Sequence, residues 1–270
     1  EGNILTEALD SRGSADSRAK NLFSDSIFRF NRVYGNRHTP VSSISFSPDL
    51  SSDGAKSRSD PATMARARAY HNLFADNLGF GWEVGPANID GLLFSNNIFW
   101  ECDRHGAGVQ VSIASPIGSG IHLLHNLLRA ETPGATVLRF GDSLLTAAQA
   151  NRRFGSSASP SRCVGNIDDD PRFADAANRD FRIDGKSACV DAGLPLTTAF
   201  GAGKGRRLAV VDALPFYDGF GIEGEQGDWI AVGAGDNLAR VEKVEFHYYR
   251  PDVLVLDREM EWKDGAPVSL

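Results

Sequence analysis

The 270-residue chain lacks the signatures of several large protein classes. Its three cysteines, Cys102, Cys163 and Cys189, are too few for a disulfide-rich scaffold, and no two of them have the Cys-x-x-Cys spacing of a zinc or redox site. No apolar run approaches the roughly 20 residues that a transmembrane helix needs, so we expect no membrane span. The net charge of −7 leaves no evident basic surface, which argues against general nucleic-acid binding.

Familiar catalytic motifs are missing as well. The sequence contains no Gly-x-Ser-x-Gly, no His-Glu-x-x-His and no dinucleotide-binding fingerprint. Residues 201–205 resemble a phosphate-binding loop but lack its spacing, so we expect a linker there. The run Asp168, Asp169 and Asp170 could bind calcium, but it lacks the alternating ligands of an EF-hand loop, and a turn is the preferred interpretation. We expect no other cofactor.

The chain does contain an internal repeat. Asn72, Asn97 and Asn126 each precede two apolar residues and follow a short apolar run, at steps of 25 and 29 residues. A period in the twenties, with short strands between, predicts a solenoid of β-rungs. Because Asn tolerates a positive φ, we expect a tight left-handed corner at each of these residues, with their side chains hydrogen-bonded in a ladder.

Short apolar runs and abundant turn residues predict an all-β fold. We expect a parallel β-solenoid over residues 1–200, with loop insertions near 47–66 and 142–160, and a linker and small antiparallel β-module over 201–270 that caps the coil. Residues 142–153 are the one helical stretch, with Asp142 or Ser143 as its cap. The strand candidates of the most regular part are 67–74, 80–84, 89–94, 97–101, 108–113, 120–128 and 135–140.

Three short motifs carry a resemblance to a known family. Residues 165–173 read Gly-Asn-Ile-Asp-Asp-Asp-Pro-Arg-Phe, residues 178–183 read Asn-Arg-Asp-Phe-Arg-Ile, and residues 187–193 read Ser-Ala-Cys-Val-Asp-Ala-Gly. This series resembles the closing turns of bacterial right-handed parallel β-helix repeat proteins, the pectate-lyase-like superfamily. The resemblance implies a right-handed coil, of which this chain is a C-terminal portion, and a secreted, periplasmic or cell-surface location. It implies a fold rather than a chemistry, because the same ending occurs on proteins of many activities.

The two ends of the chain extend this expectation. The segments 227–230 and 256–270 resemble the opening and closing strands of a small β-barrel-like appendix found at the end of some of these proteins. The chain opens in what reads as the middle of a rung, without an initiator Met or signal peptide, and stops in a strand. We expect a fragment, with missing N-terminal rungs or another protein chain packed on its open end.

Aromatic and acidic residues gather in two segments and suggest carbohydrate chemistry. Trp82 and Trp100 offer planes on which a sugar ring can stack, which makes them candidate substrate-binding residues. Glu83, Glu101 and Asp103 are candidate catalytic groups, because glycoside hydrolysis needs two carboxyl groups about 5–10 Å apart.

Arg104 and His105 are the local candidates for the alternative reaction, a lyase step on a uronic acid, which needs a base beside a neutralised carboxylate. The simpler structural interpretation places both Trp side chains in or over the coil and treats residues 103–106 as a turn. His71 and His125 share a phase in their rungs, and a stack is preferred there to a metal site. Cys163 and Cys189 lie about one rung apart, and buried thiols are preferred to a disulfide.

Two functions of different classes therefore remain. The first is an extracytoplasmic β-helix that binds or processes polysaccharide, as a lyase or a glycoside hydrolase. The second is a non-catalytic structural or interaction β-helix, a subunit of a surface assembly. Whether the chain is an enzyme stays open, because no catalytic constellation is complete. An exposed Trp82 or Trp100 beside a carboxylate would favour sugar handling, and two buried Trp side chains would favour a scaffold.

Overall fold

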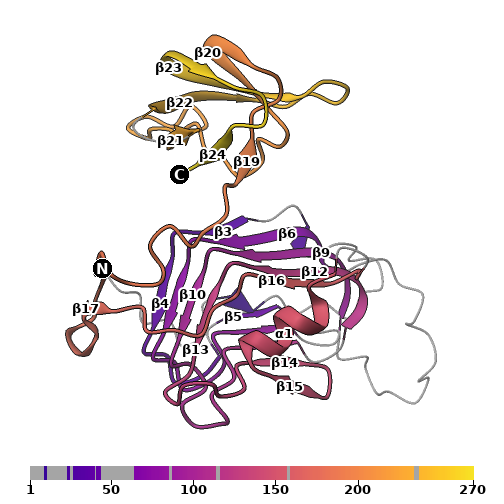
Figure 1. The fold of residues 1–270 in the computed structure, drawn as a ribbon, viewed down its shortest axis with the longest axis vertical. Helices are drawn as coiled ribbons and strands as arrows, with labels where there is room; N and C mark the ends of the chain where they lie inside the picture. The colour runs from indigo at the N-terminus through magenta and orange to yellow at the C-terminus, as the bar shows by residue number, and fades with distance from the viewer. Residues whose placement is uncertain are drawn as a thin grey trace. The chain divides into compact units, whose positions relative to one another are not determined.

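The computed structural model describes residues 9–10, 23–24, 27–39, 41–43, 64–84, 87–113, 116–156, 159–233 and 237–270. The chain is mostly β-structure and divides into two compact units, Glu1–Gly193 and Leu194–Leu270 (Figure 1). The loop expected over 47–66 lies outside the described residues except for its last three. No helix in the described part of the chain is both long and apolar enough to cross a membrane.

Three sheets, parallel except for the strand pair β14–β15, build the first unit, and the chain passes through them in a constant order (Figure 1). Sheet I contains β2 (Phe23–Ser24), β3 (Ile27–Arg29), β6 (Met64–Tyr70), β9 (Ala87–Ser95), β12 (Pro116–Leu124) and β16 (Arg162–Val164). Sheet II contains β4 (Arg32–Tyr34), β7 (Leu73–Ala75), β10 (Ile98–Trp100) and β13 (Leu127–Arg129). Sheet III contains β1 (Leu9–Asp10), β5 (Val41–Ser43), β8 (Trp82–Val84), β11 (Val111–Ile113), β14 (Leu138–Phe140) and β15 (Ser143–Leu145). Each turn runs from sheet I through sheet II to sheet III, so neighbouring strands of a sheet come from successive turns.

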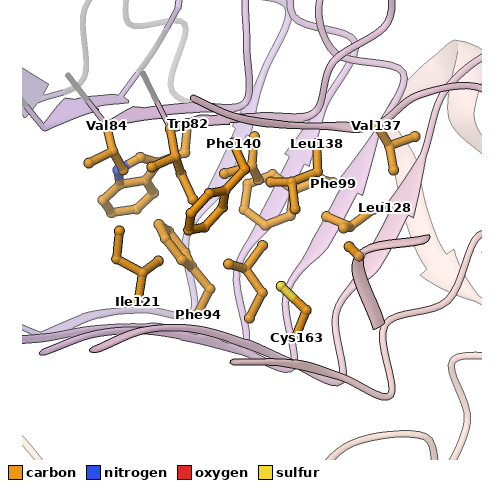
Figure 2. Packing of buried hydrophobic residues seen from close by; sticks show 14 of the residues in the cluster. Trp82, Val84, Phe94, Phe99, Ile121, Leu128, Val137, Leu138, Phe140 and Cys163 are labelled. Carbon is orange, nitrogen blue, oxygen red and sulfur yellow. The ribbon is translucent and has the colours of Figure 1, made fainter. Parts of the chain in front are cut away.

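Alternation along these strands fills the space between the sheets. Successive side chains of a strand point to opposite faces, so every second residue faces the interior. The rings of Phe74 and Phe99 stack with 4.7 Å between centroids, and Trp82 packs edge-on against Phe94 at 5.0 Å. Figure 2 shows Trp82, Phe94 and Phe99 among the aliphatic side chains of the same interior. Burial of each such side chain contributes about 1.5–3 kcal/mol to stability.

The corner between sheets I and II confirms the predicted Asn ladder. The side-chain amide of Asn72 donates to Oδ1 of Asn97 at 2.9 Å, and that of Asn97 donates to Oδ1 of Asn126 at 2.9 Å. The row extends to Asn31 on one side and to Asn166 on the other. Each acceptor oxygen also accepts the backbone N–H of the Asn that donates to it, for example that of Asn72 at 3.0 Å. Asparagine amides, four of them buried and that of Asn31 half-buried, thus join five successive turns.

The predicted positive φ was assigned to the wrong residue. His71, Asn96 and His125 have φ values of +53°, +56° and +52°, whereas the ladder residues that follow them do not have a positive φ. The left-handed residue comes one position earlier because each ladder side chain must point inward to reach the Asn of the adjacent strand. The expected strands 67–74 and 120–128 are therefore each broken in two at this corner.

Helix α1 (Ala147–Phe154) follows the last strand of sheet III. The prediction that Asp142 or Ser143 caps it was wrong, because Ser143 already belongs to β15, which pairs antiparallel with β14. Thr146 is the cap. Its hydroxyl accepts the N–H of Gln149 at 3.1 Å, and the Gln149 side chain accepts the N–H of Thr146 at 2.8 Å.

The same helix ends the Asn ladder. Asn151 accepts a hydrogen bond from the side-chain amide of Asn166 at 3.0 Å and donates its own to the backbone carbonyl of Asn166 at 2.7 Å. The side-chain amide of Asn151 therefore donates to the residue that donates to it, and not to an Asn of a further turn.

A hairpin covers the outer face of sheet II. It consists of β17 (Phe173–Asp175), the 3-10 helix η1 (Ala176–Asn178) and β18 (Asp180–Ile183). It contains the motif 178–183, on which the family resemblance partly rests, and begins at the last residue of the motif 165–173. Its Phe181 lies 5.2 Å from Tyr34 of β4, measured between ring centroids, and its Phe173 lies 5.4 Å from Trp100 of β10. These rings form a second, smaller apolar cluster outside the coil.

The second unit is an antiparallel sheet with its own core. Its strands are β19 (Thr197–Thr198), β20 (Gly203–Val210), β21 (Trp229–Val232), β22 (Leu238–Glu245), β23 (Asp252–Trp262) and β24 (Pro267–Ser269). They are ordered β19-β24-β21-β22-β23-β20, and a bridge between Ala199 and Val210 links the two ends of that order, so the sheet curves back on itself. The linker expected at 201–205 was a wrong prediction, because Gly203 and Gly205 pair with Trp262 and Met260 as the start of β20.

Candidate functional site

The corner between sheets II and III places two carboxylates one turn apart. Asp76 and Glu101 follow β7 and β10, whose registered partners are Ala75 and Trp100, and both take a left-handed conformation with φ of +52° and +49°. The backbone N–H of Asp76 donates to the carbonyl of Trp100 at 3.0 Å. Parallel strands lie about 4.8 Å apart, so the two residues occupy equivalent positions on adjacent turns.

Two further charged residues complete this group, which we call the corner cluster: Asp76, Glu101, Arg104 and Glu131. Arg104 forms an ion pair with Asp76, and each of the two side chains is 46% exposed to solvent. Burial raises the pKa of the Glu101 carboxyl above its ordinary value, the carboxylates of Glu131 and Asp76 raise it further, and Arg104 opposes them. The cluster thus contains one carboxyl group that retains its proton more readily than usual, beside one that is paired with a cation.

Arg104 is a cation here and not a base. Its hydrogen bond to Asp76 raises the pKa of its guanidinium above the ordinary value for arginine. His105 lies exposed in the following turn. The base required by a lyase step therefore has less support from the geometry than the acid required by a hydrolytic step.

Asp103 has a structural role in that turn. Its carboxylate is buried and accepts the backbone N–H groups of Ala107 and Val109, both at 3.0 Å. Gly106 faces the carboxylate so closely that a Cβ there would lie 2.2 Å from an oxygen. Of the two sequence interpretations of residues 103–106, the geometry supports the turn.

The two candidate Trp residues differ in their surroundings. Trp82 is 1% exposed and lies in the apolar core between the sheets, so no face of its ring is open to a sugar (Figure 2). Trp100 is half-buried on the outer face of sheet II. Phe173 of the covering hairpin packs edge-on against it, with an angle of 88° between the two ring planes. Only Trp100 keeps access to solvent, next to Glu101 in the chain.

Glu83 belongs to a different surface. It lies on the outer face of sheet III, in register with Ser112 of β11 and, beyond it, Arg139 of β14. Burial raises the pKa of Glu83, and Arg139 opposes that shift. The structure therefore brings Glu101 and Arg104 together, and it places Glu83 in a separate row and Trp82 in the core.

A pocket of about 410 Å³ lies at the other end of the strands of sheet II. Phe30, His71 and Asn96 border it from the first corner, and Phe173 and Phe181 of the hairpin border it from the opposite side. The amide of Asn96 lies 3.0 Å from Nε2 of His71. Burial lowers the pKa of His71, with Arg29 adding to the effect, so the ring is neutral near pH 7.

The remaining sequence candidates have structural partners. His125 lies 2.7 Å from the carbonyl of Ala192 through Nδ1. Asp168 accepts hydrogen bonds from Arg129 at 3.1 Å and from the backbone of Gly134 at 2.7 Å. Within the described ranges, no three His, Cys, Asp or Glu side chains meet in a way that could hold a metal ion.

All three cysteines are free thiols. Cys102 and Cys163 are buried, and burial raises the pKa of each to about 12. Both thiols therefore stay protonated and unreactive at neutral pH. Cys189 is half-buried.

Asp76 and Glu131 are the two residues of the corner cluster that the sequence analysis missed, and Asp76 could have been found from the repeat. It precedes Glu101 by the same interval that separates Asn72 from Asn97, and each carboxylate stands four residues after its ladder Asn. Extending the Asn repeat by four positions pairs the two carboxylates on the sequence alone. No protein-family model matches the chain, and no curated protein or solved structure matches it either.

Proposed function

We propose that the chain is the C-terminal part of a secreted, periplasmic or cell-surface right-handed parallel β-helix that binds and hydrolyses polysaccharide. Three observations support the β-helix assignment: the parallel sheets formed by successive turns, the Asn ladder, and the resemblance of residues 165–193 to the closing turns of the pectate-lyase-like superfamily. The side of such a coil offers several turns along which an extended polymer can lie.

The stacked pair of Asp76 and Glu101 carries the hydrolytic part of the proposal. Glu101, whose pKa is raised, protonates the departing glycosidic oxygen, and Asp76, ion-paired with Arg104, is the carboxylate that attacks the anomeric carbon. Water then releases the sugar from Asp76, with Glu101 now accepting its proton. The backbones of the two residues lie one strand spacing apart, about 4.8 Å, which allows their side chains to reach the carboxyl separation of about 5–5.5 Å typical of enzymes that retain anomeric configuration.

The test is a panel of polysaccharides assayed for new reducing ends and, separately, for the ultraviolet absorbance of unsaturated uronate. We expect reducing ends without that absorbance, and a loss of roughly 100-fold or more in rate for Glu101→Gln or Asp76→Asn. Asp142→Asn removes an exposed carboxylate of the same unit and should leave the rate unchanged. Growth of absorbance would instead indicate a lyase, and unchanged rates in both cluster variants would eliminate the carboxylate pair.

The second candidate is a non-catalytic structural or interaction module of a surface assembly. The burial of Trp82 and the hairpin packed over sheet II favour it, because both remove aromatic surface that a sugar could use. Absence of both products, together with absence of binding to every polymer of the panel, would support this alternative over the first.

A further inference from the structure

The pocket between sheet II and its covering hairpin has no role in the proposed hydrolysis. Its volume of about 410 Å³ lies within the range of about 300–1,000 Å³ that is typical of sites for small molecules. Phe30 and Ile183, which border it, are 54% and 41% exposed. A ligand can therefore reach this pocket from solvent.

The floor of the pocket has a cation at one edge and aliphatic side chains beyond it. Arg32 of β4 pairs in register with Leu73 of β7, and Leu73 pairs with Ile98 of β10. Phe74 and Phe99, the next residues on β7 and β10, belong to the core, so alternation directs Leu73 and Ile98 to the outer face. The three positions cover two strand spacings, about 10 Å, in the order cation, aliphatic, aliphatic.

Arg32 is an unpaired cation at this edge. Its charge acts on Asp180, but the side chain of Asp180 is engaged by Arg182 through hydrogen bonds of 2.8, 3.1 and 2.6 Å. Within the part of the chain that the structure describes, the exposed guanidinium of Arg32 makes no hydrogen bond or ion pair. None of the side chains that line the pocket is acidic. The group that this edge attracts is therefore an anion.

His71 supplies a second donor at the border of the pocket. The side-chain nitrogen of Asn96 lies 3.0 Å from Nε2 of His71, and an amide nitrogen only donates, so Nε2 accepts and Nδ1 carries the proton. This tautomer agrees with the lowered pKa of the half-buried ring. No hydrogen bond joins Nδ1 to another residue that the structure describes. Its N–H can therefore donate to the same anion as Arg32.

Aromatic rings border the pocket on two opposite sides. The ring centroids of Phe30 and His71 lie 5.5 Å apart, and those of Phe173 and Phe181 in the hairpin lie 5.2 Å apart. Aromatic rings pack favourably with one another in edge-on and offset-stacked arrangements. A rigid ring system also loses less conformational freedom on binding than a flexible chain does. These walls therefore favour a flat aromatic body over an aliphatic one.

We propose that this pocket binds a small carboxylate that carries a flat aromatic body. The carboxylate lies against the guanidinium of Arg32, and the ring system lies over Leu73 and Ile98 between the two aromatic walls. The site is confined to the outer face of sheet II and the hairpin, so its ligand is independent of any polymer bound at the corner cluster.

The experiment titrates the folded chain with naphthoate by isothermal calorimetry and compares two further ligands. Naphthylmethanol has the same ring system without the charge, and octanoate has the same charge without the rings. Because the pocket offers both a cation and aromatic walls, we expect naphthoate to bind roughly 10-fold or more tightly than either of them.

Two variants with matched controls locate the site. Arg32→Gln removes the charge and should weaken naphthoate binding by roughly 10-fold or more, with little effect on naphthylmethanol. Arg152→Gln removes the same charge from an exposed position on α1 and should leave binding unchanged. Phe30→Ala removes part of one aromatic wall and should weaken binding of both naphthalene ligands. Its control is Phe220→Ala, which removes an exposed ring from the second unit.

Failure of naphthoate to bind overturns the proposal, and so does octanoate binding of equal strength. Equal losses in Arg32→Gln and Arg152→Gln, or in Phe30→Ala and Phe220→Ala, would also overturn it. All four positions are exposed, so we expect each variant to keep the circular dichroism spectrum of the unmodified chain. If Phe30→Ala loses that spectrum, Arg32→Gln decides the question. Glu101→Gln should bind naphthoate as tightly as the unmodified chain, so this binding and the proposed hydrolysis are tested separately.

Discussion

At the corner between sheets I and II, each of five turns contributes an Asn to one continuous hydrogen-bonded row. At the corner between sheets II and III, a similar row stops after two turns. Asn36 donates to Oδ1 of Asn77 at 2.8 Å, but the amide of Asn77 then meets the sulfur of Cys102 at 3.5 Å, which is a weak acceptor.

Where the row at the corner between sheets II and III stops, the side chain of Gln110 makes the next hydrogen bonds. Gln110 accepts the backbone N–H of Cys102 at 3.0 Å and donates to its carbonyl at 3.1 Å. The segment between them forms the turn that contains Asp103, Arg104 and His105. The regular corner thus repeats one bond at every turn, and the irregular corner has room for a loop and for unlike charges. This contrast is why we expect the first corner to stabilise the fold and place the proposed hydrolysis at the second.

Disrupting the Asn row at the corner between sheets I and II should lower the stability of the fold the most. Asn97→Ala removes the donor and the acceptor that join three turns. The buried backbone N–H of Asn72 loses its acceptor, the carbonyl of Ala69 loses a donor, and Oδ1 of Asn126 loses one of its two donors. We expect the free energy of unfolding in urea to fall by about 3–5 kcal/mol. The matched control, Asn151→Ala, removes the half-buried amide at the end of the row, where water can replace its hydrogen bonds to Asn166, and we expect a loss of about 1 kcal/mol. Equal losses would show that the row does not act as a ladder.

Breaking the irregular corner should cost less. Gln110→Ala leaves the two backbone groups of Cys102 unsatisfied but disturbs no neighbouring turn. We expect a loss of about 2 kcal/mol in the free energy of unfolding, measured in the same way. A loss as large as that of Asn97→Ala would contradict the distinction between the two corners.

The smallest effect concerns the charge of Glu101. Because its pKa is higher in the folded chain than the ordinary 4.5, folded Glu101 holds its proton more tightly than the unfolded chain does. Stability therefore declines as pH rises through the window that begins at that ordinary value. Glu101→Gln lacks this decline, so its stability relative to the unmodified chain should be greater at about pH 7 than at about pH 4. Urea unfolding of both proteins at the two pH values measures this difference in stability. A variant that is relatively more stable at the lower pH would contradict the pKa shift.

A comparison variant sharpens this last result. Glu83→Gln should change stability with pH in the same direction, because burial also raises the pKa of Glu83. Only Glu101→Gln should also reduce the proposed hydrolysis. A loss of hydrolysis in Glu83→Gln, with Glu101→Gln unaffected, would move the chemistry to sheet III.

How far the sequence could predict these features depends on the range of the interactions involved. The Asn ladder follows from a repeat visible in the sequence, because each bond joins equivalent positions of adjacent turns. The inward direction of Trp82 was also within reach, since Trp82-Glu83-Val84 alternates apolar and polar residues. The packing of Phe173 over Trp100 was not, because it depends on how a distant hairpin docks on sheet II.

The ladder has a consequence for how a chain of this kind can change in length. Each amide from Asn31 to Asn126 donates to the Asn of the turn that follows it. The last amide, that of Asn166, donates instead to Oδ1 of Asn151 in α1. Every joint between turns is the same, so a duplicated turn inserted between two existing ones would find compatible bonds on both sides. A turn added beyond α1 would find none. The chain could therefore lengthen by duplication of a turn between Asn31 and Asn166, but not beyond α1.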